Sequence, residues 1–146
     1  MAYLIDTNIF IRLASRNDPQ RQICLDAMRK LRSRNEELCY TPQVVIEFWN
    51  VCTRPATARG GLDLSVDQTE RKVRLIERHF VLLPDSLATF REWRRLAFTH
   101  SLVGLAVHDA KLVASMNVQG VPSLLTINEA DFRRYANINA VHPSNL

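Results

Sequence analysis

Apolar and polar residues alternate along this chain in blocks that predict strands and helices in turn. Short apolar runs, typical of buried strands, lie at residues 2–5, 38–40, 81–83, 123–127 and 140–142. Apolar residues at helical spacing, or capping signals, predict helices at residues 19–33, 42–52, 65–80, 87–97, 105–116 and 129–135. Because strands that alternate with helices usually form a mainly parallel sheet, we expect an α/β fold.

The helix predicted from Pro42 to Cys52 is apolar on nearly every side, so we expect it to be buried. Thr41 is placed to cap its N-terminus, and Pro42 suits its first position. Glu47 is the only charged residue in this helix. A buried carboxylate is costly unless it is paired, hydrogen-bonded or bound to a metal, so Glu47 needs a partner.

Other acidic or amide side chains also lie beside apolar segments. Asp6 follows the first strand, Asp109 lies on the apolar helix near its start, and Asn128 follows the fourth strand, with Asp131 three residues later. Ligands of open α/β sheets bind at the carboxyl ends of the strands, so these side chains can meet there. Carboxylates with few cations nearby repel one another, and a hard divalent cation such as Mg²⁺ or Mn²⁺ relieves that repulsion.

Each of these residues also has a purely structural interpretation. Asp6 could end a strand and cap the next helix, and Asp109 could pair with Lys111 on the surface. Asn128 and Asp131 could cap the short helix that follows them. Together with the buried Glu47, the set favours a functional site.

Four motifs carry a resemblance to a known family. They are Leu4–Asn8 (LIDTN), Glu47 in the second long helix, His108–Ala110 (HDA) and Leu125–Phe132 (LTINEADF). These motifs resemble those of PIN-domain proteins, and within that group the chain is similar to the VapC toxins of toxin–antitoxin pairs. The similarity runs from Tyr3 to about Pro143.

The resemblance implies a three-layer α/β/α sandwich with a mainly parallel sheet, and a metal-dependent endoribonuclease. Such an enzyme would hydrolyse RNA phosphodiester bonds with a water activated by Mg²⁺ or Mn²⁺, leaving a 5′-phosphate. The metal ligands would be Asp6, Glu47 and Asp109. The fourth family position is often acidic and falls on Asn128, with Asp131 as the nearby substitute, so the number of ions stays open. Residues that orient these groups would be Thr7, Asn8 and Thr126.

The resemblance also implies partners, namely an RNA substrate, a cognate antitoxin and a second copy in a homodimer. The net charge of +4, mostly from arginine, is compatible with a polyanion. We expect RNA phosphates to be met by some of four arginines near the motifs, Arg12, Arg16, Arg54 and Arg59.

The remaining composition places limits on the class of protein. The 146 residues fit a single domain, 1–146, with a sizeable core. No apolar run approaches the roughly 20 residues of a membrane span, and no signal peptide is visible, so a cytoplasmic location is expected. Three widely spaced cysteines predict buried thiols rather than disulfides or a zinc site.

Other functions fit the sequence less well. A phosphatase of the haloacid dehalogenase type, another Mg²⁺-dependent phosphoryl-transfer hydrolase, needs a second Asp two residues after Asp6, where this chain has Asn8. A PIN-fold RNA-binding or interaction module with weakened catalysis is disfavoured by the complete set Asp6, Glu47 and Asp109, although Asn128 leaves it open. A basic RNA-binding protein of another fold would need aromatic RNA-recognition motifs, which are absent.

Overall fold

The protein is described over residues 1–146 by a computed structural model whose centre is a five-stranded sheet. The strands are β1 (Ala2–Ile5), β2 (Glu37–Tyr40), β3 (Val81–Leu82), β4 (Ser123–Leu125) and β5 (Asn139–Val141). They pair in the order β3-β2-β1-β4-β5, and every pair is parallel. The predicted mainly parallel sheet is confirmed.

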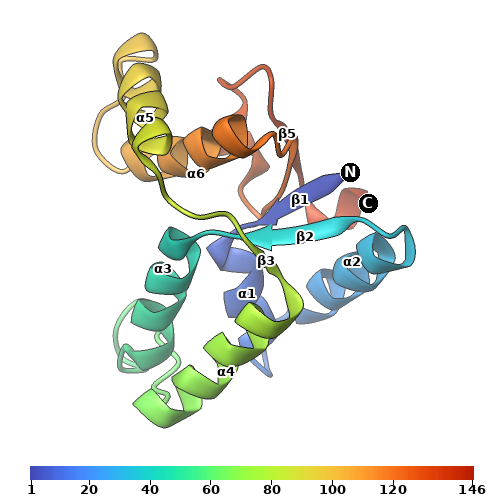
Figure 1. The fold of residues 1–146 in the computed structure, drawn as a ribbon. Coiled ribbons are helices and arrows are strands. Elements are labelled where there is room, and N and C mark those ends of the chain that lie inside the picture. The colour runs from blue at the N-terminus through green and yellow to red at the C-terminus, as the bar shows by residue number, and fades with distance from the viewer.

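Helices cover both faces of this sheet. They are α1 (Thr7–Ala14), α2 (Arg21–Ser33), α3 (Pro42–Thr53), α4 (Val66–His79), α5 (Leu87–Thr99) and α6 (Ala106–Gln119). Short 3₁₀ helices, η1 (Glu129–Phe132) and η2 (Pro143–Asn145), lie near the C-terminus. Figure 1 shows α5 and α6 on one side of the sheet and α1 to α4 on the other. This arrangement is the expected three-layer α/β/α sandwich.

Local signals define several helix ends. The Thr41 hydroxyl accepts a hydrogen bond from the Val44 N–H at 3.2 Å, as the predicted N-cap of α3 requires. Ser65 and Gln68 form the predicted capping box of α4. Gly120 ends α6 with a left-handed φ of 71°, a conformation that glycine adopts without steric cost.

Two sequence expectations need correction. Residues 7–14 were assigned no element, yet they form α1, which starts immediately after Asp6. This helix begins with the polar residues Thr7 and Asn8, and the apolar run Ile9–Ile11 that follows them is too short to show a helical period. The expected burial of α3 on nearly every side is also wrong, because Ile46 is 69% exposed on one face of that helix.

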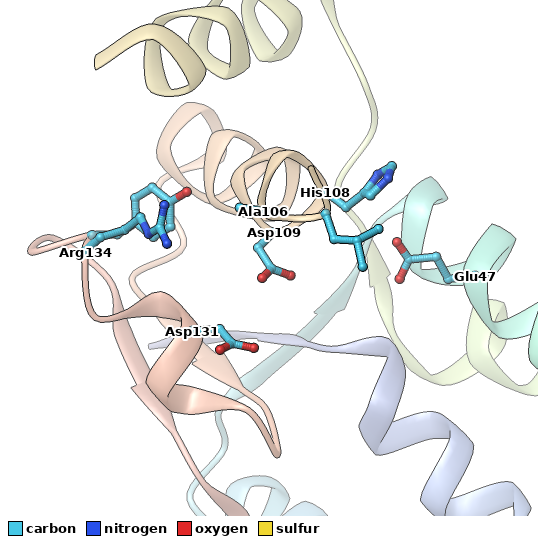
Figure 2. A pocket seen from close by; sticks show the side chains of 8 residues that line it. Glu47, Ala106, His108, Asp109, Asp131 and Arg134 are labelled. Atoms are coloured by element: carbon cyan, nitrogen blue, oxygen red, sulfur yellow. The ribbon is translucent and has the colours of Figure 1, made fainter. Parts of the chain in front are cut away.

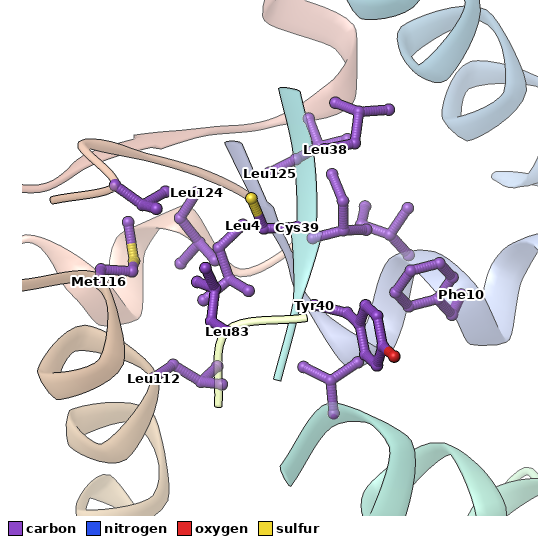
Figure 3. Close-up of a cluster of buried hydrophobic side chains, with 14 of the residues drawn as sticks. Leu4, Phe10, Leu38, Cys39, Tyr40, Leu83, Leu112, Met116, Leu124 and Leu125 are labelled. Atoms are coloured by element: carbon purple, nitrogen blue, oxygen red, sulfur yellow. The ribbon is translucent and has the colours of Figure 1, made fainter. Parts of the chain in front are cut away.

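The core lies on both faces of the sheet. In Figure 3, Leu112 and Met116 of α6 pack on one side of the strands, and Phe10 of α1 lies on the other. Each fully buried Leu or Met side chain contributes roughly 1.5–3 kcal/mol to folding. Cys24, Cys39 and Cys52 are buried free thiols within this core, as predicted. None of the helices combines the length and apolarity needed to traverse a lipid bilayer.

The centre of the sheet positions the candidate site. Strands β1 and β4 are neighbours, with Ile5 paired to Leu125, although β1 connects first to β2 on its other side. The next residues, Asp6 and Thr126, therefore leave the sheet side by side at its carboxyl edge. Open α/β sheets bind ligands at such a reversal of strand order.

Candidate functional site

Asp6 lies at this reversal point and is held by three hydrogen bonds. It is 8% exposed and caps α1, with Oδ1 accepting the Thr7 N–H at 2.7 Å. Oδ2 accepts the Thr126 hydroxyl at 2.7 Å and the Asn8 Nδ2 amide at 3.2 Å. These bonds come from Thr7, Asn8 and Thr126, the three residues that the resemblance implied, and they orient the carboxylate.

The same polar side chains tie α1 to the end of β4. Asn8 Nδ2 also donates to Thr126 Oγ1 at 3.2 Å, and Asn8 Oδ1 accepts the Ile127 N–H at 3.2 Å. Thr126 Oγ1 in turn accepts the Asn128 N–H at 3.1 Å. Because every polar atom in this network has a partner, the edge of the sheet is rigid beneath Asp6.

Glu47 reaches the site from α3. Its Oε2 accepts the Thr7 hydroxyl at 2.8 Å, and its Oε1 accepts the Gln43 Nε2 amide at 2.8 Å. The same amide donates to the His108 carbonyl oxygen at 3.0 Å, which joins α3 to the first turn of α6. The requirement that Glu47 have polar partners is met by these hydrogen bonds.

Asp109 and Asp131 face a pocket of about 420 Å³ beside Glu47. The complete lining is Glu47, Leu105, Ala106, His108, Asp109, Asp131, Arg134 and Tyr135. Figure 2 shows the carboxylates of Asp109, Asp131 and Glu47 around one space, and neither aspartate side chain accepts a hydrogen bond or forms a salt bridge. Their oxygen atoms are therefore free to bind a ligand.

Burial and mutual repulsion raise the pKa of two acids here. The pKa of Asp6 rises to about 6, chiefly because the carboxyl is buried, and the charges of Asp109 and Glu47 add to this rise. Hydrogen bonds from Thr126 and Thr7 partly oppose it. Burial also raises the pKa of Asp109 to about 6, helped by the charges of Asp131 and Glu47. The four acids thus act on one another electrostatically.

The donor set suits a hard divalent cation. Asp6, Glu47, Asp109 and Asp131 offer only carboxylate oxygens, the ligands that Mg²⁺ and Mn²⁺ prefer. No three His, Cys, Asp or Glu side chains are already close enough together to surround an ion. An ion here would therefore be bound directly by few protein oxygens. Waters would complete its coordination, as is common for Mg²⁺.

The two candidates for the fourth acidic position, Asn128 and Asp131, lie in different surroundings. Asn128 is exposed and does not line the pocket, and it touches the network only through its N–H bond to Thr126. Asp131 lines the pocket, and its charge raises the pKa of Asp109. The alternative pairing of Asp109 with Lys111 is wrong, because Lys111 pairs with Asp85.

The four arginines predicted from the sequence to contact RNA lie away from the acidic pocket. Arg12 pairs with Asp18 at 2.9 Å, and Arg54 donates to the Arg59 carbonyl oxygen at 3.2 Å. Neither these three arginines nor Arg16 lines the acidic pocket. Their contact with RNA stays a prediction.

Sequence reasoning missed two polar residues at the site. Arg134 lines the pocket, and Gln43 bonds to Glu47. Gln43 has a simple sequence signal, since it precedes Glu47 by one helical turn, whereas Arg134 lies beyond η1 and has none.

Comparisons with known proteins agree on this architecture. The family described as the PIN domain matches residues 3–138. The fold is similar to that of VapBC2 from Rickettsia felis bound to promoter DNA, with a TM-score of 0.72, 14% identity and coverage of 97% of this chain and 98% of that chain. VapBC-1 from nontypeable Haemophilus influenzae gives a TM-score of 0.72, 18% identity and 99% coverage of both chains.

A third similar structure is VapC20 of Mycobacterium tuberculosis, described as a toxin that cleaves the sarcin–ricin loop. It has a TM-score of 0.60 and 11% identity, covering 84% of this chain and 86% of that chain. A comparison with curated protein sequences found no significant match.

Proposed function

This chain belongs to the PIN domain family, and on that premise we propose that it is a divalent-metal-dependent endoribonuclease, the toxin of a toxin–antitoxin pair. The observation that carries this proposal is the gathering of Asp6, Glu47, Asp109 and Asp131 at the reversal of strand order. Such clusters of hard oxygen ligands suit metal-assisted phosphoryl transfer, and Mg²⁺ or Mn²⁺ is the expected ion.

In this proposal, Asp6, Glu47 and Asp109 would hold the ion, some of them through its bound waters. When bound, it would lower the pKa of a water and offset negative charge that develops on the phosphate. Hydrogen bonds from Thr126, Thr7 and Asn8 keep the Asp6 carboxylate in one orientation, so little reorganisation is needed when substrate binds.

Asp131 takes the fourth acidic position in place of Asn128. It is exposed and its side chain has no hydrogen bond, so an oxygen of its carboxylate is available to accept a proton from an attacking water. A single ion fits this arrangement, since Asp131 is then free to act on the water.

RNA is the proposed substrate. One protein with a similar fold is described as cleaving the sarcin–ricin loop, and the positive net charge of this chain favours a polyanion. A cytoplasmic location, where such an RNA is found, is part of the same proposal.

The antitoxin is proposed to bind an apolar groove away from the acidic pocket. This groove of about 560 Å³ lies between α1, α2, α3 and α4, and its apolar lining includes Phe10, Met28, Leu75 and Phe80. Three basic residues, Arg32, Lys72 and His79, also line the groove. An amphipathic helix with acidic flanks fits both features, and several similar folds come from toxin–antitoxin complexes.

A homodimer is proposed through a second apolar surface. Phe98 is 90% exposed, and Val103 and Leu105, in the loop between α5 and α6, are 81% and 83% exposed. Exposed apolar residues gathered in one region commonly mark a protein interface. The partner proposed for this surface is a second copy of the chain.

The experiment that tests the proposed function is cleavage of a mixed-sequence RNA by purified protein. We expect cleavage with Mg²⁺ or Mn²⁺, none with EDTA, and none by Asp6→Asn in either condition. Equal cleavage by wild type and Asp6→Asn would identify a contaminating nuclease and leave the enzyme assignment unsupported. Metal-dependent RNA binding without cleavage would favour the non-catalytic PIN module.

A further inference from the structure

A pocket lined by three carboxylates repels the substrate that it is proposed to cleave. Glu47, Asp109 and Asp131 all line this pocket, and each RNA phosphate carries a further negative charge. One divalent cation offsets only part of that repulsion. A positive group of the protein near the pocket would reduce the remaining repulsion between the acids and the RNA phosphates. Arg134 is the only Lys or Arg in the lining.

The guanidinium of Arg134 is available to a ligand. Other arginines pair with carboxylates, such as Arg12 with Asp18 and Arg95 with Glu92. Arg134 is exposed and forms no salt bridge or side-chain hydrogen bond, although Asp131 lies only three residues earlier. Its charge nevertheless reaches the site, since it lowers the pKa of Asp109 against the effect of burial.

The position of Arg134 suits contact with the RNA chain rather than with the acids. Figure 2 shows Arg134 and Glu47 on opposite sides of the pocket, with Asp109 and Asp131 between them. A polynucleotide whose reacting phosphate lies near Asp109 would continue toward one of these sides. The guanidinium can then form two parallel hydrogen bonds to the oxygens of a phosphate.

The backbone that carries Arg134 is well anchored. The next residue, Tyr135, is 4% exposed and meets the His100 ring edge-on, with 5.0 Å between the ring centroids. The Tyr135 N–H donates to the Phe132 carbonyl oxygen at 3.1 Å. Only the side chain of Arg134 has to become ordered on binding, which limits the entropic cost.

We propose that Arg134 is a phosphate-binding residue that positions RNA across the acidic pocket. This inference rests on the proposed ribonuclease function and specifies which residue of the pocket holds the substrate. It differs from the sequence expectation, in which Arg12, Arg16, Arg54 and Arg59 provided the contacts to phosphate.

Arg133 provides a matched control. It is adjacent in sequence, of the same type, exposed and without a salt bridge, but it does not line the pocket. Arg133→Ala and Arg134→Ala therefore remove the same charge from the same segment. Neither substitution removes a buried contact, so both variants should melt at the wild-type temperature.

The test is binding of a fluorescein-labelled single-stranded RNA of mixed sequence, in EDTA to prevent cleavage, over a range of salt concentrations. We expect Arg134→Ala to raise Kd roughly tenfold, because a charge-assisted bidentate contact is lost. The slope of log K against log salt should fall by about 0.7, the value for one single-strand phosphate contact. Arg133→Ala should stay within about twofold of wild type, and Arg134→Lys should restore the slope but only part of the affinity.

Cleavage kinetics with Mg²⁺ separate this proposal from the proposed function. If wild type cleaves RNA and Arg134→Ala matches Arg133→Ala in Kd, slope and KM, the role of Arg134 is overturned while the enzyme assignment stands. If wild type binds RNA without cleaving it and only Arg134→Ala loses affinity, Arg134 keeps its role and the catalytic assignment fails. If wild type binds RNA neither in EDTA nor with Mg²⁺, and does not cleave it, both are overturned.

Discussion

Ionisation of Asp6 and Asp109 at neutral pH lowers the stability of the folded state. Both have a pKa near 6 in the folded protein, against a model-compound value of 3.8, because burial and neighbouring acids disfavour ionisation. The folded state therefore binds protons more tightly than the unfolded chain. The stability that these groups contribute is fully present below about pH 4 and is lost as pH rises through about 6.

The first prediction follows from this linkage. In EDTA, Asp109→Asn should lose less stability than wild type between pH 4 and pH 7, since the variant keeps only one of the two carboxyl groups whose pKa is raised. Asp109 is partly exposed, so we expect a difference on the order of 1 kcal/mol at pH 7. Urea unfolding at several pH values measures it. If wild type instead gains stability relative to the variant as pH rises, ionised Asp109 stabilises the folded state and its pKa is lowered rather than raised.

The second prediction concerns Thr126, whose hydroxyl donates to Asp6 Oδ2 at 2.7 Å. Thr126→Val keeps the shape of this buried residue but removes the donor, so the pKa of Asp6 should rise further. Cleavage should fall by roughly 10–100-fold, as is usual when an outer hydrogen bond to a metal ligand is lost.

Thr69→Val is the control for that substitution. Thr69 is equally buried and donates to the Ser65 carbonyl oxygen at 2.9 Å, within α4 and away from the site. Both variants should lose about 1 kcal/mol of stability, but Thr69→Val should keep its activity. A similar loss of activity in both would mean that Thr126 acts only through stability.

At the scale of elements, the strands and most helices follow from the sequence because their signals are local. The caps at Thr41 and Ser65, and the stop at Gly120, lie where they were predicted. Helix α1 opens with the polar residues Thr7 and Asn8, which hide its start in the sequence, and a single residue, Asp6, separates the helix from β1. That residue is at once a strand end, a helix cap and a site carboxylate.

Gln43 shows what local patterns do not reveal. It joins α3 to α6 by donating to both Glu47 and the His108 carbonyl oxygen. The first contact follows from helical spacing, but the second links segments that are 65 residues apart. The approach of α3 to the first turn of α6 depends on the sheet order, which no single motif encodes.

The third prediction tests this link between helices. Gln43→Leu should leave the fold intact, because Gln43 is only partly buried, but it should free Glu47 to change its orientation. The Mg²⁺ concentration for half-maximal cleavage should then rise about tenfold. Gln119→Leu, which removes a side-chain bond to the Pro84 carbonyl oxygen, is the matched control and should leave that concentration unchanged.

At the scale of the whole molecule, convergence of the acids was predictable only in outline. Parallel strands bring Asp6 and the end of β4 to one edge, so a shared site was a reasonable expectation. That Asp131 lines the pocket and Asn128 does not was not predictable, since it depends on how η1 turns after β4. The place of Arg134 depends on the same turn, which the short polar segment around it does not specify.

The fourth prediction concerns the apolar groove proposed for the antitoxin. Leu75 lines this groove and is 55% exposed, so Leu75→Glu should weaken binding of the protein encoded beside this chain by at least tenfold. Val66→Glu is the control, because Val66 is 63% exposed on the same helix but outside the groove. Co-purification of tagged variants with that partner measures the effect. Equal binding by both variants would place the antitoxin elsewhere.

The central claim is that Asp6 and the three acids of the adjacent pocket bind a divalent cation, rather than serving as structural caps and ion pairs. Thermal melting of wild type and Asp109→Asn, each with Mg²⁺ and with EDTA, tests it most directly. Wild type should gain several degrees with Mg²⁺, since an ion that binds only the folded state raises the melting temperature. In EDTA the variant should melt at or above the wild-type temperature, and Mg²⁺ should raise it much less. A variant that melts far below wild type in EDTA, or gains as much from Mg²⁺, would contradict the account.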